Sequence, residues 1–383
     1  HQFKTESSYN FFERQKNTYV NDLTSENQFL RTEQGDQDTS NFNLWMSRGS
    51  IFRAKDSAKV NYEIGYDINY ESTTGVRIEN QRQSIGDFAL FSSAEITPIK
   101  NLVIRPGLRY AYNTAYQAPV IPSINLKKDW GKGYKYTYTL RASYAKGFRA
   151  PALRELYFFF VDVNHNIVGN PNLKAEKSDN FTLNFKNKIC FDKWVLKNEL
   201  GVFYNDIRNL ITLAQTTDLG QFSYINVGVY KTYGVNVQQN YQFNLIKYNI
   251  GFSYIGLYNQ ISENKSVSTF SYYPEVQNNI QWDIPKTKSS LSVFYKYQGR
   301  LPGFFVNEDN EIEESFVNAY HNCDATLSNK LYKQKILLAI GVKNIFNVQN
   351  VAANRASGVH SGSGSSVPVA TGRFFFIKTT IKI

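Results

Sequence analysis

Two histidines in polar segments are the residues best suited to bind a transition metal. His165 lies between Asn164 and Asn166, and His360 lies in the glycine- and serine-rich segment 357–366. Neutral imidazole is a good ligand for iron or cobalt, so either histidine is a candidate axial ligand of a metal chelate. His165 is the predicted metal ligand. The alternative for His165 is a hydrogen-bonding role inside its own loop, and the segment around His360 is either a mobile lid or a flexible tip.

An arginine stands on the N-terminal side of His165. The planar guanidinium of Arg149 can bind the carboxylate of a ligand through two parallel hydrogen bonds. It can equally pair with Glu155 or Glu176 inside the protein. Pro151 follows closely and forces the residue before it into an extended conformation, so we expect a strand to end there.

Four consecutive aromatic residues, 157–160, lie between Arg149 and His165. They can pack on a flat macrocycle or on neighbouring loops. A short helical turn is predicted just before them, at 152–157. The candidate substrate-binding residues are His165, Arg149, Tyr157, Phe159 and His360.

Several classes of function lack support in this sequence. Signatures of a serine hydrolase, a zinc protease or a phosphate-binding loop are absent, so we do not expect an enzyme or an intrinsic cofactor. The net charge is +11, but lysine and arginine are scattered, and no nucleic-acid partner is predicted. A basic balance suits the phosphates of lipopolysaccharide or an anionic ligand. Cys190 and Cys323 have no metal-binding or disulfide spacing, and we expect them to be small strand residues.

The elements that must position these side chains are β-strands. In segment 60–70, apolar and aromatic residues occupy every second position, and the same pattern recurs along the chain. Charged residues make up only 20%, with 27 tyrosines and 28 phenylalanines, yet no run of eighteen apolar residues exists. A membrane-spanning strand needs only ~10 residues with every second one apolar. We therefore predict an all-β fold, a transmembrane antiparallel β-barrel, with about sixteen such strands in this chain.

The connections between the predicted strands alternate between short and long. Short turns on one rim and long loops on the other are typical of an outer-membrane barrel, whereas a soluble sandwich would mix its connections. Placing the last strand's end at the periplasmic rim puts every long loop outside the cell. The predicted extracellular loops are about 14–38, 72–83, 148–177, 209–229, 263–271, 300–317 and 346–371.

Several motifs resemble those of TonB-dependent outer-membrane receptors. Phe148-Arg149-Ala150-Pro151 and Asn170-Pro171-Asn172-Leu173 resemble the paired FRAP and NPNL boxes of these receptors, which flank a histidine in many haem receptors. Segments 201–211, 233–235 and 343–347 resemble further family motifs, and the alternating segment 374–383 resembles a C-terminal outer-membrane insertion signal, although it ends in isoleucine. The resemblance covers about 102–383.

The resemblance implies that part of the protein lies elsewhere. Receptors of this family have twenty-two strands and an N-terminal plug inside the barrel. The chain 1–383 lacks a recognisable signal peptide and plug, so we interpret it as the C-terminal portion of the barrel, starting at the seventh strand. The plug and the first six strands would then belong to a separate or missing chain.

The implied function is energy-coupled import of a scarce metal chelate across the Gram-negative outer membrane. The transported ligand would be haem, cobalamin or a ferric siderophore. The implied partners are the TonB–ExbB–ExbD complex, a surface lipoprotein over the loops as in Bacteroidetes receptors, and outer-membrane lipid and lipopolysaccharide. Sixteen strands are also enough for a passive porin. A porin and a surface-binding barrel therefore remain as alternatives.

Overall fold

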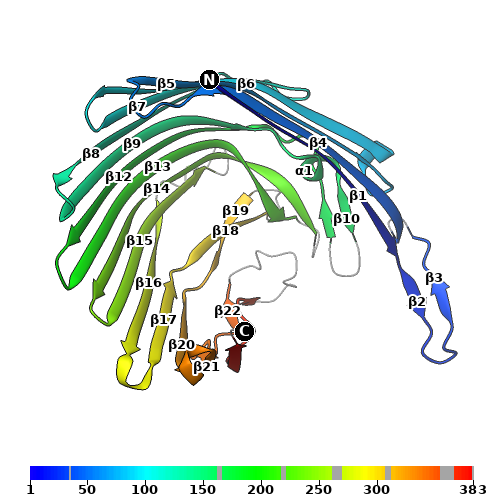
Figure 1. Cartoon of the computed structure of the whole chain (residues 1–383). Helices are drawn as coiled ribbons and strands as arrows, with labels where there is room; N and C mark the ends of the chain where they lie inside the picture. The colour runs from blue at the N-terminus through cyan, green and yellow to red at the C-terminus, as the bar shows by residue number, and fades with distance from the viewer. Residues whose placement is uncertain are drawn as a thin grey trace.

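The computed structural model describes residues 1–33, 36–161, 166–216, 221–260, 270–306, 312–353 and 366–381. Most of these residues belong to one large antiparallel sheet, which forms a strongly curved wall (Figure 1). The sheet contains twenty strands, of which four short ones lie in connections, namely β10 Phe159–Val161, β11 Asn166–Val168, β18 Leu301–Val306 and β19 Ile312–Val317. The other sixteen follow one another in chain order, each antiparallel to the next, as the sequence predicts.

The strands of the wall are longer than an average strand of a soluble domain. Their bounds are β1 Gln2–Asn17, β4 Gln37–Arg53, β5 Val60–Thr74, β6 Arg82–Ile99, β7 Leu102–Asn113, β8 Ile121–Lys132, β9 Tyr136–Arg149, β12 Glu176–Cys190, β13 Trp194–Gln215, β14 Phe222–Phe243, β15 Ile246–Gln260, β16 Ser271–Ile284, β17 Ser289–Gln298, β20 Tyr320–Leu331, β21 Ile336–Lys343 and β24 Phe374–Ile381. Cys190 and Cys323 are free and half-buried, and both are strand residues, as expected.

The two faces of the wall differ in chemistry because successive side chains of a strand point to opposite sides. Leu90 and Tyr110 face each other across β6 and β7, and they are 66% and 62% exposed on the outer face. Their neighbours Ala89 and Ala111 are also paired, but they are buried on the inner face. Large apolar residues therefore point outward, and small or polar residues point inward, as in a barrel immersed in lipid.

Two aromatic belts cross the outer face. One contains Tyr144, Phe181 and Tyr204, which lie directly opposite one another on β9, β12 and β13. The other contains Trp130, Tyr138 and Phe185, whose rings lie 5.7 to 6.3 Å apart. Farther along the wall, Trp194 lies against Phe191 and Tyr241 at 4.2 and 6.3 Å, and on β13 it is ten residues from Tyr204 of the first belt. At ~3.3 Å per residue and a tilt of ~40° this gives a height of ~25 Å, which matches the apolar band of a membrane barrel.

The connections separate onto two rims. Those on one rim are short, for example the residues between β8 and β9 or between β14 and β15. Those on the other rim are longer and carry small elements, namely β2 Tyr19–Asn21, β3 Gln28–Leu30, η1 Glu79–Gln81, α1 Leu153–Tyr157, β10 Phe159–Val161, β11 Asn166–Val168, β18 Leu301–Val306, β19 Ile312–Val317, β22 Asn350–Ala352 and β23 Ser366–Pro368.

One predicted loop, 209–229, is mostly strand. β13 continues to Gln215 and β14 begins at Phe222, so only the tip of the hairpin lies outside the ladder. Asn209 has a positive φ of 56°, and the ladder is interrupted there before it resumes in the same register at Leu210 and Val227. This interruption coincides with residue 208, where the sequence pattern predicts the end of the strand.

The two outermost strands of the wall, β1 and β24, are not paired with each other in the described part of the chain. β1 pairs with β4, and β24 pairs with β21. β1 is exposed along nearly its whole length. Among the described residues, none of the helices has both the length and the apolar character needed to cross a membrane.

Candidate functional site

The connection between β9 and β12 starts and ends at one ion-pair cluster. Arg149 donates from Nε and Nη2 to the two carboxylate oxygens of Glu176, at 2.8 Å each. Its Nη1 donates to Glu155 at 2.9 and 3.1 Å. Both predicted internal partners are therefore engaged at once. The two glutamate side chains are only 13% and 15% exposed, so Arg149 balances two largely buried negative charges.

The surroundings of Arg149 raise the pKa of its guanidinium. The hydrogen bonds that Arg149 donates to Glu176, joined by those to Glu155, raise the pKa of the guanidinium against the opposing effect of partial burial. The group is thus a fixed cation. Its strong donors all point to protein carboxylates, which favours a structural role over ligand binding for this side chain.

Helix α1 is the predicted helical turn, and it begins beside this cluster. Pro151 is buried, and the Ala152 amide donates to Glu155 Oε2 at 2.8 Å, which satisfies an open amide at the start of the helix. Leu153 and Leu156 are each 1% exposed. The helix is therefore held by its charged end and by its buried leucines together.

The Asn170-Pro171-Asn172-Leu173 segment forms a turn, as expected. Asn170 Oδ1 accepts from the Asn172 amide at 2.9 Å, and Asn170 Nδ2 donates to the Tyr224 carbonyl at 2.9 Å. Leu173 packs into a small core with Leu156 and Ile211. The turn thus joins α1 to the hairpin of β13 and β14, which supports its interpretation as a scaffold.

The aromatic run is divided among several protein contacts. Tyr157 is half-buried and packs against the small core. The Phe158 ring stacks on Phe42 at 5.6 Å. Phe159 is half-buried in β10, where its amide donates to the Arg77 carbonyl at 2.8 Å. Packing on neighbouring elements, one of the two predicted alternatives, therefore accounts for much of this run.

Both candidate histidine ligands, His165 and His360, lie outside the described residues, so their metal-binding roles stay predictions. Within the described ranges, no group of three or more histidine, cysteine, aspartate or glutamate side chains is arranged to hold a metal ion. The structure brings Arg149, Tyr157 and Phe159 into one connection, on α1 and the strands beside it.

A polar cavity of about 620 Å³ lies on the inner face beside Arg149. Arg109 Nη1 donates to Asp67 Oδ2 at 3.0 Å across it, and Arg48 contributes a further cation. Such a lining suits a charged ligand or a charged protein surface. The sequence analysis did not single out these residues. The sequence could have indicated them through the polar positions of each alternating strand, because these positions face inward and include both Asp67 and Arg109.

These features together define the wall of a membrane β-barrel with its elaborated connections on one rim. The chain belongs to the TonB-dependent receptor family, because the model of the TonB dependent receptor-like β-barrel matches residues 1–345.

Solved receptors have the same fold. A variant of the ferric enterobactin receptor PfeA of Pseudomonas aeruginosa, in complex with enterobactin, aligns with a TM-score of 0.65 at 17% identity, over 99% of this chain and 60% of the receptor. The siderophore receptor PirA of Acinetobacter baumannii gives 0.66 at 14% identity, over 98% and 59%. The iron transporter FrpB of Neisseria meningitidis gives 0.65 at 12% identity, over 98% and 59%. The chain thus spans about three fifths of these receptors.

Proposed function

We propose that this chain is the C-terminal portion of the barrel of a TonB-dependent transporter, which imports a scarce metal chelate across the Gram-negative outer membrane. The observation that carries the proposal is the family match over residues 1–345, on a wall of sixteen strands with long connections on one rim. Transport then uses the proton-motive force through the TonB–ExbB–ExbD complex. Chemistry on the ligand is not part of this function.

The proposed whole receptor includes a plug and six further strands. Those strands would bridge the outer edges of β1 and β24, which are unpaired within the described residues, because an open edge leaves backbone groups without partners in lipid. The charged inner cavity with Arg48, Asp67 and Arg109 would then face the plug. The long connections would lie outside the cell, where a surface lipoprotein can cover them.

A ferric siderophore is the ligand class that the comparisons favour, since two of the similar receptors are named for siderophores and a third for iron. Haem and cobalamin stay in the proposal because of His165, which lies between the FRAP and NPNL boxes. His165 would supply an axial ligand, and His360 a second one. Tyr157 and Phe159 would line the approach to the ligand.

Uptake measurements test this function. Cells lacking the gene are supplied in turn with a labelled ferric siderophore, haem and cobalamin. We expect uptake of one chelate to fall to background, and to fall equally when TonB is removed. Uptake that persists without TonB would contradict the proposal. A Soret band on the purified receptor that is lost in His165→Ala, but kept in His321→Ala, would identify haem.

The porin alternative rests on the count of sixteen strands in the wall. Single-channel recording of the purified chain in a planar lipid bilayer separates the two functions. A porin gives stable, ohmic ion conductance without any other protein. The C-terminal portion of a transporter barrel cannot close by itself, so this chain alone gives no stable conductance.

A further inference from the structure

Four cations gather on the outer face of four consecutive wall strands. They are Lys146 on β9, Lys177 on β12, Arg208 on β13 and Lys231 on β14. On each of these strands the cation points to the same, outer side as one residue of an aromatic row, which consists of Tyr144, Phe181, Tyr204 and Tyr233. Lys146 and Lys231 lie two residues beyond that row, and Lys177 and Arg208 lie four beyond it. At ~3.3 Å per residue these distances are ~7 and ~13 Å along the strands.

Lys177 and Arg208 are directly opposite each other in the ladder between β12 and β13. Both are exposed, and neither forms an ion pair within the described residues. Like charges that face each other across two strands repel and destabilise the sheet. An anion seated between the two side chains would remove this repulsion.

The carboxylates nearby do not neutralise the patch. Asp179 lies opposite Lys146 in the ladder and accepts from the Tyr144 hydroxyl at 2.7 Å, and Asp206 lies 3.6 Å from Lys231. The four cations outnumber these two carboxylates, so an excess of positive charge remains on this part of the outer wall, at Lys177 and Arg208. This charge lies just beyond an aromatic row, at the height where lipid headgroups meet the hydrocarbon.

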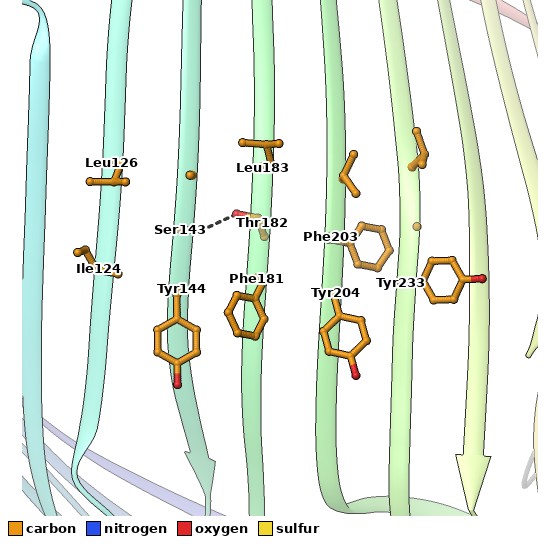
Figure 2. A pocket seen from close by; sticks show the side chains of 14 residues that line it. Ile124, Leu126, Ser143, Tyr144, Phe181, Thr182, Leu183, Phe203, Tyr204 and Tyr233 are labelled. Carbon is orange, nitrogen blue, oxygen red and sulfur yellow. Dashed lines mark hydrogen bonds between the residues drawn. The ribbon is translucent and has the colours of Figure 1, made fainter.

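An apolar groove lies directly below the cations. Its volume is about 600 Å³, and Ala142, Leu183, Val202 and Val235 form its floor. Figure 2 shows the rings of Tyr144, Phe181 and Tyr204 in a row across three strands, with Leu126 and Leu183 above that row. The groove exists because Ala142 is small among larger neighbours. A single acyl chain has the shape and the chemistry to fill it.

We propose that this surface, the groove together with Lys146, Lys177, Arg208 and Lys231, binds one lipid A molecule of the outer leaflet. The lipid's phosphates lie against the cations, and one acyl chain lies in the groove. The charge complementarity selects a phosphorylated lipid, and the position of the groove relative to the cations fits a molecule that joins phosphate to hydrocarbon. The site deepens the proposed lipopolysaccharide contact and rests on the proposed placement of this rim outside the cell.

Native mass spectrometry of the purified receptor in detergent tests the site, with diphosphoryl lipid A as the probe. We expect one tightly retained lipid A, and about tenfold or greater loss of affinity in the double variant Lys177→Gln, Arg208→Gln, because two charge-assisted contacts are removed. The matched control is Lys128→Gln, Lys132→Gln, which removes two cations from the outer face at the opposite rim. This control should bind as the unchanged protein does.

A groove variant tests the acyl-chain half separately. Ala142→Phe fills the floor, and we expect it to weaken binding of diphosphoryl lipid A while the β-sheet circular dichroism stays unchanged. The proposal would be overturned if the two double variants bound diphosphoryl lipid A equally well. It would also be overturned if the unchanged protein bound lipid A without phosphates as well as it binds diphosphoryl lipid A. These binding measurements do not depend on transport. The transport proposal can therefore be confirmed when the lipid site is overturned, and the lipid site can be confirmed when the transport proposal is overturned.

Discussion

Arg149 and Glu176 are the last residue of β9 and the first residue of β12, and they face each other directly in the ladder. Their paired hydrogen bonds therefore lie at the base of the connection 150–175. Glu155, on α1 within that connection, completes the cluster. The two ends and the first helix of the connection are thus fixed by one guanidinium.

Removing Arg149 alone should loosen this connection. Arg149→Met leaves Glu155 and Glu176 largely buried without a cation, and we expect a local loss of about 2–3 kcal/mol, reduced because the arginine is partly exposed. The triple variant Arg149→Met, Glu155→Gln, Glu176→Gln removes the charges together and should recover part of the loss. Hydrogen exchange across 150–175 measures both. An unchanged exchange rate in the single variant would rule out this role.

Tyr116 makes the same region sensitive to alkaline pH. Its hydroxyl donates to the Leu173 carbonyl at 3.1 Å, and burial raises its pKa, with Tyr157 and Glu155 acting in the same direction. The stabilisation is therefore fully present below the unfolded pKa of ~10 and is lost as the pH rises through the higher folded pKa.

The comparison variant for this titration is Tyr116→Phe, which lacks the hydroxyl at every pH. We expect the unchanged protein to resist proteolysis within 150–175 better than the variant at pH 8, by about 1 kcal/mol of local stability. The difference should shrink above pH ~10. A difference that is independent of pH would show that ionisation of Tyr116 plays no part.

Asn226, on β14, links the connection 150–175 to β13 through its side-chain amide. Its Nδ2 donates to the carbonyls of Lys174 and Asn209 at 3.0 and 2.8 Å, and its Oδ1 accepts from the Lys174 amide at 2.8 Å. Asn226→Ala loses all three bonds and should cost about 1–3 kcal/mol locally. Asn226→Asp keeps the acceptor but sets a carboxylate oxygen against two carbonyls, so it should lose at least as much, as judged by hydrogen exchange at residues 170–175. Exchange that is unchanged in Asn226→Ala would contradict the link.

The strand pattern predicts the wall well because lipid imposes it. Every second residue must be apolar over the width of the membrane, so segments such as 60–70 and 134–144 carry the signal on their own. The prediction fails where the ladder leaves the lipid. Beyond Asn209 no lipid-facing apolar alternation is required, so the last six residues of β13 do not carry the pattern, although they continue the ladder in the same register.

The candidate site is only partly predictable for a different reason. The pairing of Arg149 with nearby carboxylates follows from short separation along the chain. The inner cavity depends on side chains such as Arg48 and Asp67 from strands whose alignment the sequence does not state. The outward cations Lys177 and Arg208 likewise become neighbours only through the register of β12 and β13.

Gly169 sets how closely β11 approaches the end of α1. Its amide donates to the Phe158 carbonyl at 2.7 Å, and a Cβ there would lie 2.7 to 2.9 Å from backbone atoms of Leu156 and Phe158. Backbone cannot move aside as a flexible side chain can. Gly169→Ala should therefore displace this segment and cost about 1–3 kcal/mol locally. The control is Gly251→Ala, whose added Cβ meets only Gln277 Cβ at 3.8 Å. We expect faster hydrogen exchange across 153–173 in the first variant alone, and the same exchange in both variants would mean that this close approach does not hold the connection in place.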